Sequence, residues 1–223
     1  MKIKKSLIFT IAFFALFIVF TILVCLVDVQ AIGPESSEVG FATLNNAVFG
    51  ALGSNETIYT VTELLGLIPL AVAAGFAVLG LCQAIKRKNV LKTDTEIFIL
   101  GGFYVTVALA YIAFEIIEIN YRPILMDGVL EASYPSSHTM LAICIMTTAV
   151  IELNRLLKGK KALLIAIDCI CVSIAASIVI GRLLAGVHWT TDIIAGLLLS
   201  GALISLYCLA LDIAKAKKAN NVQ

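Results

Sequence analysis

Charged side chains are scarce in this chain. Asp, Glu, Lys and Arg make up 14% of its 223 residues, whereas a soluble globular domain carries about 25%. Hydrophobic residues account for 61%, and the mean hydropathy is +1.03. So little charge cannot cover a water-facing surface, which excludes a soluble enzyme, a disordered segment and a coiled coil. The formal net charge of only +1 gives no reason to expect nucleic acid as a partner.

Metal-binding patterns are also lacking. All six cysteines lie inside apolar runs, and none stands at metal-ligand spacing from a histidine. We interpret them as small buried apolar residues, because free cysteine packs like one. The sequence therefore predicts neither a metal nor any other cofactor.

Six apolar runs are long enough to cross a bilayer, which takes about 20 residues. The first is too long for the core of a signal peptide. Because the runs are continuous rather than alternating, they favour helices over barrel strands. We predict one all-α domain over residues 1–223, a polytopic membrane protein with six transmembrane helices. The predicted spans cover residues 6–27, 61–85, 97–119, 138–157, 162–181 and 192–212.

The basic residues predict the orientation. All but two of the 16 Lys and Arg precede the first run, follow the sixth, or lie between runs two and three or four and five. Alternation of the spans places these four segments on one side, which the positive-inside rule identifies as the cytoplasm. We predict a plasma-membrane protein with both termini cytoplasmic. The outer connections are then residues 28–60, 120–137 and 182–191.

The first outer connection contains a further short pattern. Residues 39–52 have apolar side chains at roughly helical spacing, which predicts a short helix at the membrane interface. It could serve as a lid or lateral gate for a lipid substrate, or as a packing element that caps the bundle.

Four residues gather at the outer face. The two basic exceptions are Arg122 and Arg182, and the only two histidines are His138 and His188; all four stand at outer ends of the runs. A purely structural protein has no reason to collect them there. This coincidence is the first indication of an active site.

The neighbouring residues suit phosphate chemistry. Pro135 and Ser136 open the fourth run, and a helix start of this kind binds anions through its free N–H groups and dipole. His188 and Asp192 are four residues apart, so on a helical turn they share a face. The carboxylate could then accept the imidazole N–H and leave the other ring nitrogen as a nucleophile. Two arginines could clamp the phosphoryl oxygens.

These motifs resemble a known signature. Arg122-Pro123, then Pro135-Ser136-Ser137-His138, then Arg182-x5-His188-x3-Asp192 are similar to the three motifs of the type 2 phosphatidic acid phosphatase (PAP2) superfamily. Its pattern is K-x6-R-P, P-S-G-H and S-R-x5-H-x3-D, and it includes lipid phosphatases and vanadium haloperoxidases. The resemblance implies a PAP2-like helical core and catalysis without a metal.

The resemblance also implies catalytic roles. His188 would attack phosphorus to form a phosphohistidine, and Asp192 would orient it. His138 would protonate the leaving lipid oxygen and later help to activate water.

It implies a phosphate-binding set as well. Arg122 and Arg182 would hold phosphate oxygens, assisted by the Ser136 hydroxyl and the Ser137 backbone N–H.

Three positions depart from the pattern. Ser137 replaces a glycine, Gly181 replaces a serine, and Glu115 stands where the family has its lysine. A carboxylate beside a phosphate dianion is unfavourable unless it is paired. We predict that Glu115 pairs with one of the active-site arginines and holds its guanidinium in place.

Other polar residues in or near the runs are interpreted structurally. Asp168 lies inside the fifth run, where we favour pairing with polar bundle groups or lysines over a proton or ion role. Trp189 is interpreted as an interfacial anchor, and Glu63 and Glu118 as residues at span ends.

We expect a metal-independent phosphatase that acts at the outer face on a lipid phosphate or diphosphate. Candidate substrates are undecaprenyl diphosphate, phosphatidylglycerophosphate and phosphatidic acid. The alternatives are a lipid phosphotransferase and a degenerate, non-catalytic lipid-headgroup binder; a transporter is a weaker alternative, because no inverted repeat is visible. The partners are the bilayer and its lipid, and the oligomeric state is left open.

Overall fold

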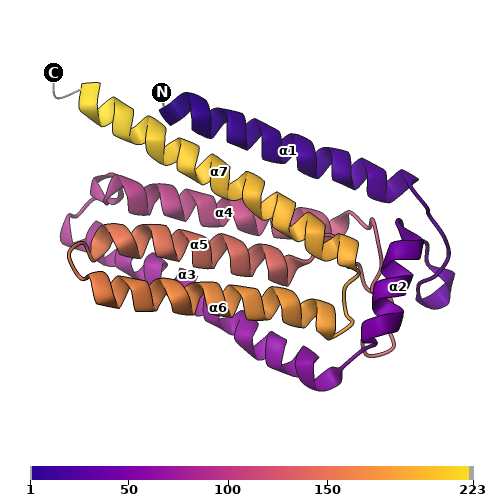
Figure 1. The fold of residues 1–223 in the computed structure, drawn as a ribbon. Helices are drawn as coiled ribbons and strands as arrows, with labels where there is room; N and C mark the ends of the chain where they lie inside the picture. The colour runs from indigo at the N-terminus through magenta and orange to yellow at the C-terminus, as the bar shows by residue number, and fades with distance from the viewer. Residues whose placement is uncertain (1, 221–223) are drawn as a thin grey trace.

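The computed structural model describes residues 2–220, which form a helical bundle (Figure 1). Six helices are long and apolar enough to cross a membrane, so the chain is an all-α, multi-pass membrane protein as predicted. The helices are α1 (Lys2–Leu26), α2 (Ala42–Leu52), α3 (Glu56–Lys86), α4 (Thr95–Ile116), α5 (Ser137–Leu156), α6 (Lys161–Leu184) and α7 (Thr190–Asn220).

The predicted spans overlap all six long helices. The largest differences are at α7, which continues to Asn220, and at α3, which begins at Glu56. Asn55 explains the early start of α3, because its side chain accepts a hydrogen bond from the Ile58 N–H (2.9 Å) as an N-cap. The α6 helix continues through Leu184, so Arg182 lies in its last turn rather than in a connecting loop.

The packing of the bundle is centred on α5. Helices α3, α4, α6 and α7 pack against it, and α1 packs along α7 (Figure 1). The ring of Phe103 on α4 packs against Tyr207 on α7, with centroids 5.1 Å apart. The outward faces carry apolar side chains that are more than half exposed, such as Ile8, Leu81 and Val172. A bilayer solvates such faces, whereas every backbone polar group must be satisfied within the helices.

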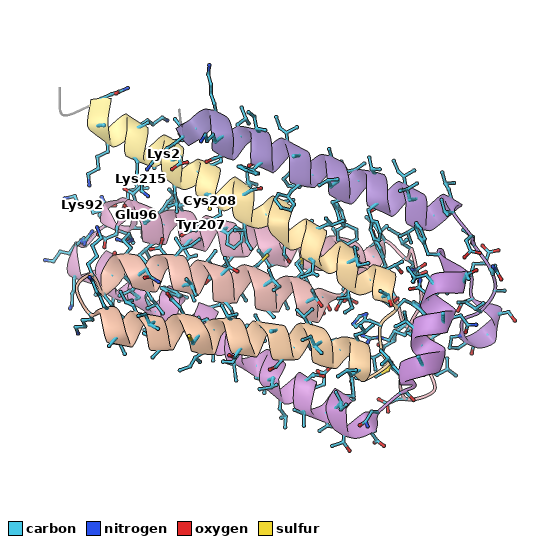
Figure 2. All side chains as sticks on the ribbon, in the orientation of Figure 1. Lys2, Lys92, Glu96, Tyr207, Cys208 and Lys215 are labelled. Carbon is cyan, nitrogen blue, oxygen red and sulfur yellow. The ribbon has the colours of Figure 1, made fainter. Side chains whose placement is uncertain are left out.

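The two ends of the bundle differ in character. Both termini lie at one end, where Figure 2 shows Lys2, Lys92 and Lys215. The starts of α5 and α7 and the end of α6 lie at the opposite end, beside α2 (Figure 1). The motif residues identified from the sequence are therefore gathered at the end away from the lysines.

Helix α2 confirms the predicted short helix and packs on the start of α7. Its buried Asn45 side chain donates to Thr191 Oγ1 (2.9 Å), and the Thr191 N–H donates to Asn45 Oδ1 (3.3 Å). Phe49 of α2 lies against Trp189, with ring centroids 5.6 Å apart. These contacts favour the packing role of α2 over that of a mobile lid.

Candidate active site

A hairpin in the loop between α4 and α5 forms one wall of the site. The Arg122 N–H donates to the Glu131 carbonyl and the Ser133 N–H to the Asn120 carbonyl, both at 2.9 Å. Asp127 and Gly128 both adopt positive φ at its tip (50° and 79°), as a tight hairpin turn requires. The hairpin therefore fixes where Arg122 and Ser133 stand.

The start of α7 forms a second wall. Asp192 is in the first turn, and its Oδ2 accepts the N–H of Trp189 (2.9 Å), the residue just before the helix. This is the return half of a capping box. Its Oδ1 accepts from Asn120 Nδ2 (3.2 Å), and its backbone carbonyl accepts the Ser136 N–H (3.0 Å). Asp192 therefore joins the hairpin to the starts of α5 and α7.

The imidazole of His188 is held by this frame. Its Nδ1 lies 3.1 Å from the Ser133 carbonyl oxygen and 3.6 Å from Asp192 Oδ2. A carbonyl oxygen can only accept, so Nδ1 carries the proton and Nε2 keeps its lone pair. The sequence predicted that Asp192 accepts the hydrogen bond from the imidazole N–H. In the structure the Ser133 carbonyl accepts it, and the Asp192 carboxylate accepts hydrogen bonds from Trp189 and Asn120 instead.

The Nε2 atom of His188 is buried and has no hydrogen-bond partner within residues 2–220. Burial, and next the positive charge of Arg122 and of Arg182, hold the pKa of His188 well below its usual value. The imidazole is therefore neutral at physiological pH. A neutral, buried and oriented ring nitrogen of this kind can act as a nucleophile.

Arg182 is fully buried, with 0% of its side chain exposed. Its Nη1 donates to Glu63 Oε1 at 2.6 Å, and its guanidinium lies over the ring of Tyr59, 5.1 Å from the centroid. Its Nε and Nη2 have no partner in the part of the chain that the structure describes. These two atoms form one edge of the guanidinium, which is the fork that binds two phosphate or carboxylate oxygens.

His138 is the second residue of α5 and stands beside the same carboxylate. Its Nε2 lies 3.4 Å from Glu63 Oε2. Its Nδ1 is buried and unpartnered among residues 2–220. Glu63 does lie near the start of α3, as interpreted from the sequence, but that interpretation missed its contacts with two of the predicted site residues. An acidic residue in an apolar span was the signal that could have identified it.

The other predicted phosphate ligands also reach this end of the bundle. Arg122 Nε lies 3.0 Å from Glu131 Oε2. Ser136 caps α5 by accepting the Thr139 N–H (3.4 Å). Ser137 follows at the first position of the helix, where the N–H has no acceptor within the helix.

The prediction for Glu115 was wrong. Within residues 2–220, Arg122 pairs with Glu131 and Arg182 with Glu63, and neither pairs with Glu115. Glu115 nevertheless lines one cavity together with Arg122, Ser137 and His188. Glu131 was better placed, because the hairpin sets it directly across from Arg122.

Three other interpretations are also resolved. Asp168 accepts a hydrogen bond from Asn154 (2.8 Å), which is the predicted pairing with a polar bundle group. Glu118 accepts from the Tyr121 hydroxyl (2.7 Å). Trp189 is not an exposed anchor, since it is 2% exposed and its Nε1 donates to the Tyr121 carbonyl (2.7 Å).

Gly181 has a steric explanation. A Cβ placed on Gly181 would overlap the Cγ2 methyl of Thr62 on α3. The serine of the family pattern is therefore disfavoured by contact with a neighbouring helix, and the lost hydroxyl donor follows from that packing.

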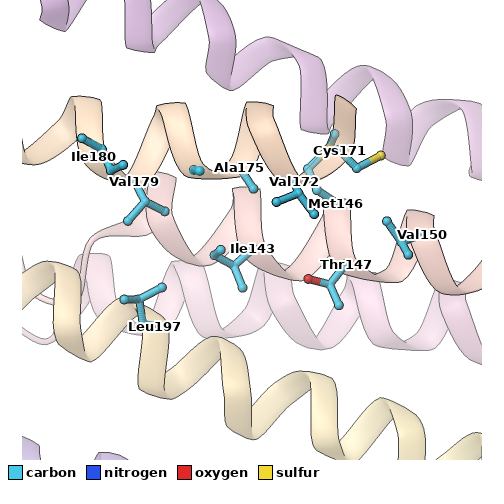
Figure 3. Close-up of a pocket in the computed structure, with 11 residues that line it drawn as sticks. Ile143, Met146, Thr147, Val150, Cys171, Val172, Ala175, Val179, Ile180 and Leu197 are labelled. Atoms are coloured by element: carbon cyan, nitrogen blue, oxygen red, sulfur yellow. The ribbon is translucent and has the colours of Figure 1, made fainter. Parts of the chain in front are cut away.

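An apolar cavity of about 420 Å³ begins at the polar cluster. Glu63, Ser137 and His138 lie along it, and its other walls are mainly apolar. These walls are formed by Gly66, Leu67, Pro69, Leu70, Ala108, Tyr111, Leu141, Ala142 and Ile178. A second apolar hollow of about 410 Å³ lies between α5, α6 and α7, lined by residues such as Ile143, Val172 and Leu197 (Figure 3). Its lining carries no charged side chain, so this hollow is separate from the polar cluster.

The comparisons with known proteins agree with this arrangement. Residues 117–214 match the family model of the PAP2 superfamily. This segment contains the hairpin, the starts of α5 and α7 and the end of α6, so the PAP2 resemblance found in the motifs is confirmed. No curated protein matches the sequence.

The PAP2 fold extends beyond that segment. The chain is similar to the crystal structure of a transmembrane PAP2-type phosphatidylglycerolphosphate phosphatase from Bacillus subtilis, with a TM-score of 0.61 and 20% sequence identity. The match covers 89% of this chain and 93% of that one. Most of the chain therefore adopts the fold of a membrane PAP2 protein.

Proposed function

We propose that this protein is a phosphatase that removes phosphate from a lipid phosphate or diphosphate through a phosphohistidine. One observation carries the proposal: the buried Nε2 of His188 has no partner in residues 2–220, and its Nδ1 is fixed by Ser133. An oriented lone pair, with the Nε and Nη2 atoms of Arg182 nearby and without a partner in residues 2–220, is the arrangement that in-line attack on phosphorus needs.

The reaction follows from these positions. His188 Nε2 bonds to phosphorus as the ester oxygen leaves, and His138 gives that oxygen a proton. Arg122, Arg182 and the start of α5 with Ser136 and Ser137 stabilise the charge on the three equatorial oxygens. Water, activated by His138, then cleaves the N–P bond and releases phosphate. Asp192 and Ser133 keep the His188 ring in place throughout.

The cavity supports a lipid as the substrate. It joins the polar cluster at His138 to apolar walls on α3, α4 and α5. A phosphate at the cluster would place an attached chain in these apolar surroundings. The structural relative is named for phosphatidylglycerolphosphate, which makes that lipid the first to test, with undecaprenyl diphosphate and phosphatidic acid beside it.

We also propose that the site faces away from the cytoplasm of a plasma-membrane protein. The site lies at the bundle end opposite both termini and the lysines (Figures 1 and 2). The positive-inside rule assigns the lysine-bearing end to the cytoplasm.

The test is phosphate release by the purified protein from these three lipids. His188→Ala should abolish turnover, whereas Tyr121→Phe, which alters a nearby hydroxyl outside the site, should retain it. Activity should persist in EDTA and be inhibited by vanadate, which mimics pentavalent phosphorus. Binding of all three lipids without turnover would support the non-catalytic alternative, and transfer of phosphate to an acceptor other than water would support a phosphotransferase.

A further inference from the structure

Glu63 lies outside all three sequence motifs, in the second turn of α3. Its carboxylate divides between two partners: Oε1 lies 2.6 Å from Arg182 Nη1 on α6, and Oε2 lies 3.4 Å from His138 Nε2 on α5. One side chain therefore connects a proposed phosphate ligand to the proposed proton donor.

Glu63 contacts only one nitrogen of Arg182 and one of His138, and it leaves their other polar atoms free for a substrate. It contacts Nη1 of Arg182 and leaves the Nε/Nη2 fork without a partner anywhere in residues 2–220. It contacts Nε2 of His138 and leaves Nδ1 equally unpartnered in that range. A carboxylate that merely blocked the site would cover the fork, which makes the strongest bidentate contacts.

We infer that Glu63 is a positioning residue of the active site, which fixes His138 so that its Nδ1 carries the transferred proton and fixes Arg182 so that its Nε/Nη2 fork binds phosphate. This inference rests on the proposed phosphatase function. It adds a residue, and an assignment of the ring nitrogens, that the motifs do not contain.

The proton transfers follow from hydrogen-bond chemistry. Glu63 Oε2 lies 3.4 Å from Nε2 of His138. Because a carboxylate accepts and cannot donate, this contact favours a proton on Nε2 in both the charged and the neutral ring. Only Nδ1 is then available for exchange. In the first step the doubly protonated His138 ring gives its Nδ1 proton to the leaving ester oxygen, as the O–P bond breaks and the bond from His188 to phosphorus forms. The ring is then neutral, with its remaining proton on Nε2. In the second step Nδ1 takes a proton from the water that attacks phosphorus, and the N–P bond breaks.

Gly66 allows α3 to approach the imidazole ring of His138 closely. It lies three residues after Glu63 on α3, and a Cβ there would stand 3.0 Å from His138 Cδ2 and 3.3 Å from Nε2. The backbone of α3 thus packs on the imidazole edge that faces Glu63. The close packing and the carboxylate both act on this edge of the ring and oppose its rotation.

The experiment compares two substrates with the purified full-length protein. Phosphatidic acid has an alkoxide leaving group that needs protonation, whereas p-nitrophenyl phosphate needs little. Glu63→Gln keeps the shape but supplies only one accepting oxygen, so it cannot serve both His138 and Arg182. We expect kcat on phosphatidic acid to fall about 10- to 100-fold, and kcat on the aryl phosphate to fall distinctly less.

Two further variants separate positioning from a general structural effect. In a His138→Ala background, Glu63→Gln should leave the ratio of the two rates unchanged, because the proton donor is already absent. Glu56→Gln is the matched control: Glu56 is exposed two turns earlier on α3, and its variant should retain the wild-type ratio. Glu63→Asp, which keeps the charge on a shorter stem, should fall between wild type and Glu63→Gln.

If Glu63→Gln lowered kcat by the same factor on both substrates, the inference would be overturned, while the proposed phosphatase function would stand. A change in the ratio that persists in the His138→Ala background would also overturn it. Wild-type protein that releases phosphate neither from these two substrates nor from phosphatidylglycerolphosphate or undecaprenyl diphosphate would instead overturn the proposed function, and this inference with it.

Discussion

Replacing Gly181 by the serine of the PAP2 pattern should destabilise this protein. The new Cβ would overlap the Cγ2 methyl of Thr62, which is 2% exposed and packed between α3 and α6. Overpacking of a buried contact costs about 1–3 kcal/mol. A helical glycine is itself unfavourable, and its replacement regains roughly 0.5 kcal/mol. We therefore expect Gly181→Ser to lose about 0.5–2.5 kcal/mol of unfolding free energy.

A second substitution should relieve the overlap. Thr62→Ser removes only the methyl and keeps the hydroxyl, which donates to the Tyr59 carbonyl at 2.9 Å. Alone it should cost about 1 kcal/mol through lost apolar contact. With Gly181→Ser the methyl is no longer in the way, so the double variant should be more stable than the sum of the single effects by about 1–2 kcal/mol.

Thermal unfolding of the purified protein in detergent measures this cycle. The control pairs Gly181→Ser with Thr60→Ser on the same helix, where an exposed threonine hydroxyl donates to the Glu56 carbonyl (3.0 Å). The effects of these two substitutions on the unfolding free energy should be additive. The packing explanation of this glycine would be wrong if Gly181→Ser were as stable as wild type. It would also be wrong if the effects of Gly181→Ser and Thr62→Ser on the unfolding free energy were additive.

Three other predictions concern the site and its orientation. In a His138→Asn variant His188 is the only histidine. Its lowered pKa predicts a neutral imidazole at pH 6, where an ordinary histidine of pKa about 6.5 is mostly protonated. ¹⁵N NMR shifts typical of an imidazolium at that pH would contradict this prediction. Glu115→Gln should strengthen inhibition by inorganic phosphate, because it removes a carboxylate that forms no salt bridge within residues 2–220 and repels the dianion. Weaker inhibition would restore a positioning role for Glu115. In a cysteine-free variant, Val129→Cys in the exposed hairpin should react with an impermeant thiol reagent outside intact cells and Lys88→Cys should not; the reverse pattern would invert the proposed topology.

Local features of the chain were accessible from its sequence. The apolar runs predicted all six long helices, because a bilayer demands about 20 apolar residues of any helix that crosses it. The spacing of His188 and Asp192 and the Pro135-Ser136 start of α5 are set by residues within a few positions of one another. Such short-range geometry depends on helix capping and turn chemistry, which the sequence carries directly. The short helix α2 was predicted from the helical spacing of its apolar residues.

The partners of these residues depended on tertiary structure. Glu63 is 119 residues from Arg182 in the sequence, and it meets Arg182 only because α3 packs against both α5 and α6 with one particular rotation about its axis. The sequence does not indicate that rotation: α3 is apolar on nearly all sides, since its bilayer face is as hydrophobic as its buried face. The hairpin likewise decided that Arg122 pairs with Glu131 rather than Glu115. It also decided that the Ser133 carbonyl, rather than Asp192, accepts the hydrogen bond from His188 Nδ1. The sequence thus determined which helices form and at which end the chemistry gathers, whereas the rotation of each helix and the folding of one loop decided which polar atoms meet there.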